Sequence, residues 1–393
     1  MFKNRKVAIL AFIMVVNALS YGTIIPLLYP YAARFGITPL GMGLLFTSFS
    51  ITQFFATPIL GRLSDRFGRK PIMMICLLGT ALSLAVFAMA QSVAVLFIAR
   101  MIDGITGGNA SVAQAIISDS TEGEERAKSF GVIWAAFGFG FLFGPAIGGI
   151  LSGYALTAPF WMSAALAVVA TILCYFLLPE TLKPEMKARQ NHEPLFKLKS
   201  IFQALFLPYT GILLFISFMA ASAMNAMILG FQAFTLDVLH LNTTQIGLFF
   251  SGFGLIGIIM QMGAIGPILK KFPSKKNILR ACIGLSGITM LVTFFSGSVI
   301  PFFISMMTFA AVGAFRDPMI SALLSERTKA EDQGGIMGIN QSYISLGQIF
   351  GPLAAGLVTT YSIHYTFLLA AVLLGIAYGA TRWLYLPVKK LDL

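Results

Sequence analysis

The sequence predicts an all-α integral membrane protein, with twelve transmembrane helices arranged as two parallel six-helix halves. Its composition is the first reason, because 57% of the 393 residues are hydrophobic and only 11% are charged. A soluble domain carries about a quarter charged residues. The second reason is that apolar runs of about twenty residues, long enough for a helix to cross a bilayer, recur along the chain. The third is an internal repeat, described below.

Twelve apolar runs give the expected spans. The first follows the basic segment Lys3-Asn4-Arg5-Lys6 and resembles a signal peptide, but it is long and lacks a clear cleavage site, so we expect it to remain as a span. The spans are expected at about 7–28, 40–60, 71–90, 93–117, 129–152, 158–178, 209–236, 244–268, 277–297, 299–324, 335–360 and 363–386.

The cations fall almost entirely on one side of these alternating spans. Of the 27 Lys and Arg residues, 24 fall on one side, counting Arg280 and Arg382 at the ends of their spans. Arg34 alone lies on the opposite side, and Arg100 and Arg316 remain inside spans. The positive-inside rule therefore predicts a cytoplasmic basic side that carries both termini. This distribution accounts for the net charge of +12 without a nucleic-acid partner. We expect a monomeric, multi-pass protein of the cell membrane, the inner membrane in a bacterium, with the lipid bilayer as its surroundings.

The two halves align when the chain is shifted by 207 residues. Gly144-Pro145 then falls on Gly351-Pro352, and Gly149 falls on Gly356. The expected division is a first half at 1–180, a cytoplasmic linker at 181–208 and a second half at 209–393. The linker is a solvated tether or, alternatively, a partly helical segment on the anionic leaflet. Parallel halves suit alternating access to a substrate bound midway between them.

A charged hairpin, Gly61–Lys70, separates spans two and three. Its Asp65 is expected to accept hydrogen bonds from a helix N-terminus and to pair with Arg66 or Arg69. The simpler alternative is that its cations only anchor the loop on the basic side. A later copy around Gly266–Lys276 lacks the acid, so the two hairpins should be unequal.

Charges inside spans are costly and usually functional. Arg100 and Asp103 are three residues apart and share a helical face, and Gln114 is expected on that face about three turns further on. Asp103 is a candidate proton acceptor and Arg100 a candidate anion binder; the alternative is a self-satisfied structural pair. Arg316 and Asp317 are adjacent, so their side chains are expected to diverge by about 100°, with Arg316 reaching toward the cytoplasmic end.

Spans one and seven each carry a polar face. Asn17 and Tyr21 are four residues apart in span one, and Asn225 and Gln232 are seven apart in span seven. We expect these faces to line a cavity for substrate.

Span five carries glycines at a regular spacing. Gly140, Gly144 and Gly148 form one helical stripe that allows close approach of another backbone. Pro145 removes a backbone donor and can bend the helix. We expect a tight seam between spans of the two halves, or else plain helix packing.

These motifs resemble those of the major facilitator superfamily. Gly61–Lys70 is similar to the family's loop between spans two and three. Leu178-Pro179-Glu180-Thr181 is similar to the motif at the end of the family's sixth span. The run from Gly131 through Gly140, Gly144-Pro145 and Gly148-Gly149 resembles the signature of the drug:proton antiporter branch. Arg100–Gly108 resembles span four of tetracycline exporters. The resemblance covers essentially the whole chain.

The resemblance implies roles for particular residues. It implies a cytoplasmic gate formed by Gly61, Asp65, Arg66, Gly68 and Arg69, joined by Asp119 and Arg126. Related exporters often carry an acid in span one, where this chain has Asn17. Because an amide cannot titrate, the expected proton site moves to Asp103.

The expected function is secondary active transport that exports small amphipathic, drug-like molecules in exchange for protons by alternating access. One alternative keeps the fold and makes the protein a dedicated metabolite or siderophore carrier, or an importer. Another is a non-transporting membrane sensor or scaffold. No phosphate-binding loop is present, and the three His and three Cys do not cluster, so we expect no enzyme activity, cofactor or metal.

Overall fold

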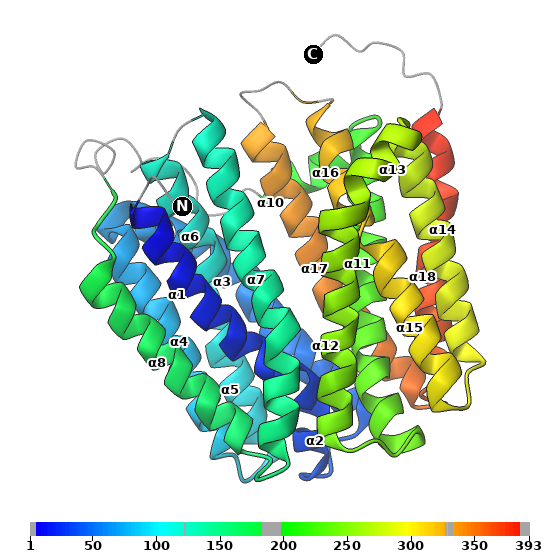
Figure 1. The fold of residues 1–393 in the computed structure, drawn as a ribbon, viewed down its shortest axis with the longest axis horizontal. Coiled ribbons are helices and arrows are strands. Elements are labelled where there is room, and N and C mark those ends of the chain that lie inside the picture. The colour runs from blue at the N-terminus through cyan, green and yellow to red at the C-terminus, as the bar shows by residue number, and fades with distance from the viewer. Residues whose placement is uncertain (1–4, 122, 183–197, 327, 329–332, 386–393) are drawn as a thin grey trace. The chain divides into compact units, whose positions relative to one another are not determined.

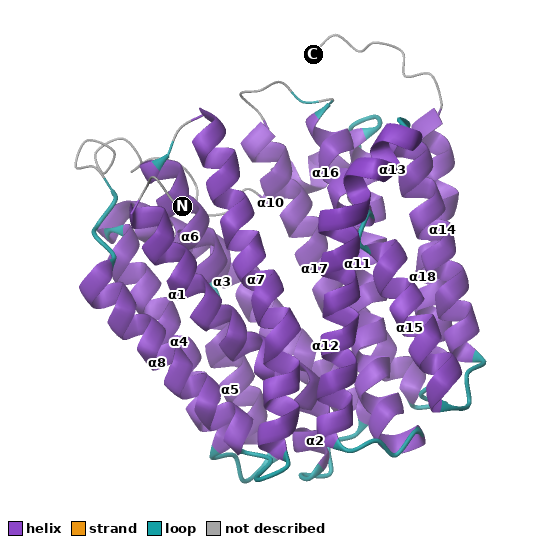
Figure 2. Ribbon diagram, viewed as in Figure 1, coloured by secondary structure: helices purple, strands orange, loops and turns teal. Residues whose placement is uncertain are grey.

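The computed structural model describes residues 5–121, 123–182, 198–326, 328 and 333–385 (Figure 1). Every regular element in this part of the chain is helical (Figure 2). The long helices of the first half are α1 (Arg5–Ile24), α3 (Pro39–Phe67), α4 (Arg69–Ala88), α5 (Val93–Ile105), α6 (Asn109–Ser120), α7 (Gly123–Ser152) and α8 (Ala158–Leu177).

The second half of the chain follows the same order. Its helices are α10 (Leu198–Leu205), α11 (Thr210–Ala233), α12 (Thr243–Ile259), α13 (Ile265–Lys271), α14 (Lys275–Phe294), α15 (Val299–Gly313), α16 (Arg316–Ser325), α17 (Gln333–Thr359) and α18 (Tyr365–Ala380). Shorter elements are the helix α2 (Leu28–Ala33), the 3-10 helices η1 (Ile25–Leu27) and η5 (Thr381–Tyr385), and the π-helices η2 (Phe234–Val238) and η3 (Met260–Ala264).

These helices confirm the predicted all-α membrane fold. Ten helical segments within the described residues are long and apolar enough to cross a membrane. The two remaining predicted spans coincide with the segment α12–η3–α13 and with α17. Every predicted span therefore has a helical counterpart.

The chain divides into two compact units. Unit 1 comprises Met1–Ile37, Ser48–Phe196 and Leu241–Ser251, and unit 2 comprises Thr38–Thr47, Lys197–His240 and Gly252–Leu393. The helices α3 and α12 thus each contribute residues to both units. The predicted halves 1–180 and 209–393 instead place each of these helices wholly within one half. Most of the predicted linker lies outside the described residues.

The core of unit 1 is apolar and is held by a few hydroxyl groups. α1 packs against α7 and α8, and α4 packs against α8. Leu10, Met73 and Ile116 are among its fully buried side chains. Ser20 Oγ donates to Ser163 O over 2.8 Å and Ser163 Oγ donates to Ser20 O over 2.9 Å, which joins α1 to α8. Such exchanged hydrogen bonds between small residues allow close helix packing in a membrane.

Unit 2 repeats this arrangement. α11 packs against α17 and α18, and α14 packs against α18, as α1, α7, α8 and α4 do in unit 1. The interruption of a span also recurs. α6 begins at Asn109 and α16 begins at Arg316, positions that are 207 residues apart. Both the packing and the interruption follow the repeat predicted from the sequence.

Candidate functional site

The two charged residues of span four lie on α5 and contact each other. Arg100 Nη1 donates a hydrogen bond to Asp103 Oδ2 over 2.9 Å. Both residues are buried, with exposures of 3% and 5%. The spacing of three residues predicts this contact, because such side chains share one face of an α-helix. The two charges therefore neutralise each other within the span.

Aromatic side chains surround the guanidinium of Arg100. The ring centroid of Phe49, on α3, lies 4.1 Å from Arg100 Cζ, which is a cation–π contact. Tyr21, on α1, is half-buried and interacts with the same guanidinium. Arg100 Nε is buried and has no hydrogen-bond partner among the described residues. Arg100 thus keeps one buried N–H group that a further acceptor would stabilise.

Hydroxyl groups surround the carboxylate of Asp103. The hydroxyl groups of Thr80 and Ser83, both on α4, lie near this carboxylate, and Ser83 Oγ donates to Thr80 O over 3.0 Å. Asp103 therefore has one cation as its direct partner and two hydroxyl groups nearby. A charged carboxylate needs such partners inside a membrane protein, and a protonated one needs fewer.

Span four is interrupted directly after this pair. α5 ends at Ile105 and α6 begins at Asn109, so the residues between them are not helical. Gln53 Nε2, on α3, donates to Gly107 O over 3.2 Å and satisfies one carbonyl of the interruption. Asn109 Nδ2 donates to Asn17 Oδ1 over 3.3 Å, so the polar face of span one meets the start of α6.

Gln114 lies beyond the interruption of span four. Three regular helical turns from Asp103 would place it beside the pair, but the interruption between α5 and α6 breaks that count. Gln114 lies on α6 and is exposed. A place for Gln114 in a substrate cavity stays a prediction.

The charges of span ten also differ from expectation. Arg316 and Asp317 were expected to diverge, but Arg316 Nε and Nη2 donate to the Asp317 carboxylate over 2.9 and 3.2 Å. Arg316 has a long flexible side chain that can turn back to its neighbour. Arg316 is buried, with 9% exposure, at the start of α16, while the Asp317 side chain is 66% exposed.

The polar residues of span seven are placed separately. Both lie on α11, and Asn225 Nδ2 donates to Ala221 O over 2.9 Å within that helix. Gln232 is fully buried. A cavity lined by these two residues stays a prediction.

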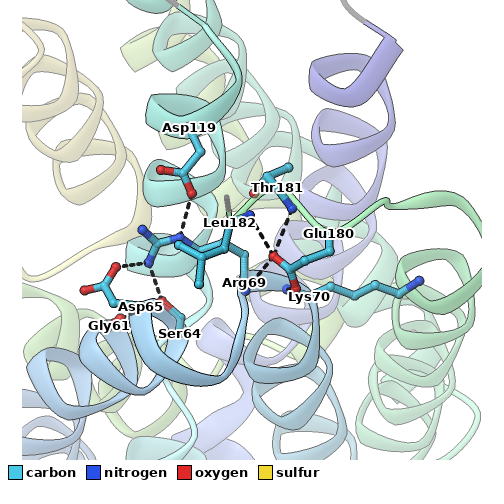
Figure 3. Close-up of polar contacts among 9 residues, drawn as sticks. All are labelled: Gly61, Ser64, Asp65, Arg69, Lys70, Asp119, Glu180, Thr181 and Leu182. Carbon is cyan, nitrogen blue, oxygen red and sulfur yellow. Dashed lines mark hydrogen bonds and ion pairs between the residues drawn. The ribbon is translucent and has the colours of Figure 1, made fainter. Parts of the chain in front are cut away.

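A second polar cluster lies where the predicted charged hairpin turns from α3 to α4 (Figure 3). Arg69 is at its centre. It forms an ion pair with Asp65 one turn earlier, and its Nε lies 2.8 Å from Asp119 Oδ2 on α6. Its Nη1 donates to Ser64 Oγ over 2.7 Å, and Ser64 Oγ donates to Gly61 O. One buried guanidinium therefore ties α3, α4 and α6 together.

The carboxylate that caps a helix here is Glu180, not the expected Asp65. Glu180 lies just after α8 and accepts hydrogen bonds from four backbone N–H groups. The donors are Arg69 at 3.0 Å, Lys70 at 3.2 Å, Thr181 at 2.9 Å and Leu182 at 2.9 Å (Figure 3). Two of these N–H groups belong to the first turn of α4, where a negative charge is favoured by the helix dipole.

Electrostatics and backbone conformation agree with this cap. Burial alone would raise the pKa of Glu180, but its four N–H partners outweigh burial and hold the pKa below the usual value of 4.5. Gly68 precedes α4 with a φ of +118°, and a Cβ there would lie 2.5 Å from Glu180 Oε2. Glycine is thus required at position 68 both by its backbone and by the carboxylate.

Other predicted members of the gate are placed differently. Arg66 lies over the ring of Phe67, 5.4 Å from its centroid, and this contact is separate from the Arg69 cluster. The side chain of Arg126 lies outside the described part of the structure. A part for Arg126 in the gate stays a prediction.

The copy of this cluster in unit 2 is weaker, in line with the missing acid. Lys275 pairs with Glu326, the repeat equivalent of Asp119, but the two side chains are 33% and 51% exposed. Ser274 caps α14 through a hydrogen bond from Asn277 N over 3.4 Å, where unit 1 uses Glu180. An exposed ion pair contributes little to stability.

The glycine stripe of α7 packs within unit 1. A Cβ at Gly140 would lie 2.3 Å from Ala18 C, and one at Gly144 would lie 2.6 Å from Gly22 C. A Cβ at Gly148 would lie 2.1 Å from Thr23 O. These partners are on α1, so the expected seam between the two halves is wrong for this stripe.

Two further glycines of α7 have other surroundings. Gly149 faces the start of α12, where a Cβ would lie 2.9 Å from Thr243 O. Thr244 Oγ1 also donates to Gly149 O over 2.9 Å. Gly131 has open space, because a Cβ added there would meet no described heavy atom within 4 Å. Pro145 lies inside α7, and its carbonyl oxygen would meet a Cβ at Gly247.

The chain is similar to proteins of known class over nearly its whole length. The family model described as Major Facilitator Superfamily matches residues 10–274 and 213–392. Multidrug resistance protein 2 of Bacillus subtilis (strain 168) is 28% identical, over 92% of this chain and 91% of that protein. The class C tetracycline resistance protein of Escherichia coli is 32% identical, over 79% of this chain and 78% of that protein.

Solved structures of transporters share the fold. The human organic anion transporter MFSD10 has a TM-score of 0.73 and 22% identity, over 96% of this chain and 99% of that chain. The nucleoside transporter NupG has a TM-score of 0.78 and 14% identity, over 97% of this chain and 99% of that chain. At these identities the likeness concerns the fold alone.

Proposed function

Because the chain belongs to the major facilitator superfamily, whose members are membrane transporters and not enzymes, we propose that it exports small amphipathic, drug-like molecules in exchange for protons. The observation that carries the coupling is the buried pair of Arg100 and Asp103 in span four. The multidrug and tetracycline resistance proteins among its relatives favour export of drugs.

Asp103 is the proposed proton carrier. While it is charged, the hydrogen bond from Arg100 stabilises it, and the hydroxyl group of Thr80 lies nearby. When it takes a proton, its charge disappears and Arg100 loses its counter-ion. A lone cation inside a span costs about 2.5–3.5 kcal/mol on insertion scales. Protonation therefore makes the neighbourhood of α5 favour a new acceptor for Arg100 or a different arrangement of the span.

Arg100 is the proposed link between the proton and the rest of the site. Its buried Nε already lacks a partner among the described residues, and its Nη1 bond to Asp103 would be released. An acceptor group of a substrate, or Tyr21 beside it, would then compete for the guanidinium. The charged and protonated states of Asp103 would thereby bind substrate differently, which coupling requires.

The cluster around Arg69 is the proposed gate of the basic side, which we take to be cytoplasmic. Its support is the number of elements that one guanidinium joins, namely α3, α4 and α6, with Glu180 fixing the start of α4. In this gate the cluster would hold the ends of α3, α4 and α6 together within unit 1, and it would not bind substrate. The topology with both termini in the cytoplasm and the monomeric state belong to the same proposal.

The driving force is sufficient for drug export. A proton that crosses about 100 mV and about one pH unit releases roughly 3.7 kcal/mol. One-for-one exchange would sustain a substrate gradient of about two and a half decades.

The test uses purified protein in proteoliposomes with an imposed pH gradient, and tetracycline and a quinolone as probes. The variant Asp103→Asn should abolish gradient-driven movement. It should still exchange labelled probe for unlabelled probe without a gradient, which shows that it folds and binds. The matched control is Glu326→Gln, which removes an exposed carboxylate at the end of α16 and should retain both activities.

Gradient-driven transport by Asp103→Asn would remove this residue from the coupling. Loss of exchange as well would make the pair of Arg100 and Asp103 a structural or substrate-binding element. Movement of a single metabolite class with the proton, and of neither probe, would favour the dedicated carrier.

A further inference from the structure

A groove lies on unit 2 where α18 ends and η5 begins. Its volume is about 470 Å³. The lining residues are Phe215 on α11, Ile376, Gly379 and Ala380 on α18, and Arg382 and Trp383 on η5. Four of these six are apolar or lack a polar side chain, and none is acidic. The groove is therefore an apolar channel with a cation and an indole at one end.

The position of the groove along the helix fits a membrane interface. The apolar segment Tyr365–Tyr385 is long enough to cross a membrane, and Arg382 and Trp383 lie in its last turn. Trp383 is 57% exposed, and Ile376 is 46% exposed about two turns before it. Tryptophan and arginine are enriched at the level of lipid head groups, while exposed aliphatic side chains lie among acyl chains.

The polar end of the groove is held in place by neighbouring contacts. Lys276 Nζ, on α14, donates to Leu384 O over 2.7 Å. Lys276 and Arg280 also lie over the ring of Tyr385, each 5.8 Å from its centroid. η5 is thus attached to the start of α14 by two cations. These cations add positive charge beside η5, the element that carries Arg382, which raises the attraction of this end for an anion.

The groove has free room beside α18. A Cβ at Gly379 would meet no described heavy atom within 4 Å. This glycine therefore leaves room that a larger side chain would fill without a clash. A linear acyl chain fits such a channel, because it needs apolar contact and no hydrogen bonds.

We propose that this groove binds a phospholipid with an anionic head group, whose phosphate contacts Arg382 and whose acyl chain lies along Ile376, Gly379 and Phe215. The cation matches the phosphate, the interfacial indole matches the head-group level at which the lipid lies, and the apolar channel matches the acyl chain. The site is separate from the buried pair on α5 and does not depend on transport. Only the choice of leaflet, the one on the basic side, depends on the proposed orientation.

The first test removes the charge. Purified protein in detergent is titrated with phosphatidylglycerol or phosphatidylcholine, and thermal unfolding and lipid retention in native mass spectrometry are measured. Phosphatidylglycerol should bind and stabilise more strongly. Arg382→Gln should weaken its binding about fivefold, the effect of one cation near a lipid phosphate. Lys271→Gln, an exposed cation on α13 outside the groove, should keep the wild-type affinity.

The second test fills the channel without changing any charge. Gly379→Leu should reduce retention of phosphatidylglycerol, whereas Gly266→Leu, at an exposed and equally open glycine of α13, should not. Equal phosphatidylglycerol binding by Arg382→Gln and Lys271→Gln would overturn the proposal. Wild-type retention by Gly379→Leu would also overturn it, as would equal stabilisation by inorganic phosphate, which lacks an acyl chain.

Discussion

The contact between α1 and α7 predicts a large difference between two glycine substitutions on one helix. A Cβ at Gly144 would lie 2.6 Å from Gly22 C, 2.7 Å from Thr23 N and 2.8 Å from Gly22 Cα, all on α1. Ordinary van der Waals contact begins near 3.4 Å, so Gly144→Ala forces the two backbones apart by about 0.8 Å. These are main-chain atoms, which cannot rotate away as a side chain does.

The magnitude follows from two opposing effects. Overpacking costs about 1–3 kcal/mol, and the higher helix propensity of alanine returns up to about 1 kcal/mol. Gly131→Ala is the matched control, because Gly131 lies on the same helix with no described atom within 4 Å of a Cβ. It gains the propensity without the overpacking. We expect Gly144→Ala to be less stable than Gly131→Ala by about 1–3 kcal/mol.

Thermal unfolding of the two variants, side by side in the same detergent or nanodisc, measures this difference. Gly144→Ala should melt below the wild type, and Gly131→Ala should melt at or slightly above it. Equal melting temperatures would refute the close approach of α1 and α7. A lower melting temperature for Gly131→Ala than for Gly144→Ala would refute it as well.

Three further predictions concern the Arg69 cluster. The pKa of Glu180 is lowered in the folded protein, so its stabilisation is present above the usual value of 4.5 and is lost as the pH falls through the lower folded value. Glu180→Gln should therefore flatten the fall in melting temperature as the pH drops below the usual value of 4.5; an unchanged fall would contradict the cap. Asp119→Ala should lower the free energy of unfolding by about 3 kcal/mol and Asp65→Ala by about 1 kcal/mol, because the Asp119 side chain is 6% exposed and the Asp65 side chain 27%. Equilibrium unfolding of both variants tests this order. Gly68→Ala should cost about 1–3 kcal/mol through its positive φ, and a stability equal to the wild type would argue against that backbone.

The fold was largely predictable because its signals are local. Hydrophobic runs of fixed length indicate spans, and the repeat indicates two similar halves. The pairing of Arg100 with Asp103 was equally local, since three residues of helix determine it. The position of Gln114 was not. The adjacent glycines Gly107 and Gly108 can mark a helix end, but glycine is also tolerated within membrane helices, so the interruption could not be told from a continuous span.

The helix cap was missed because it depends on a tertiary contact. Glu180 and the start of α4 are more than one hundred residues apart in the sequence, at Arg69 and Lys70. A carboxylate after a span and a positively charged turn are each unremarkable alone. The sequence predicts the nearer acid, Asp65, as the helix cap, but Asp65 pairs with the Arg69 side chain instead.

The glycine stripe shows a similar limit. Its spacing predicts that another backbone approaches closely, and α1 does so at Gly140 and Gly144. A pattern on one helix does not contain the identity of the partner helix. The pairing of Arg316 with Asp317 was missed for another reason. The spacing gives the directions in which the two side chains leave the helix, but the arginine side chain is long enough to turn back to its neighbour.

The division of α3 and α12 between the two units has a consequence for cutting the chain. Unit 1 includes Leu241–Ser251, and unit 2 includes Thr38–Thr47. A fragment that ends before the linker would therefore lack the α12 segment against which Gly149 packs, and the complementary fragment would lack Gly43, which faces Gly356. Each gene half, expressed alone, would leave a glycine-lined surface uncovered, so the two fragments should accumulate as folded protein only when they are synthesised together.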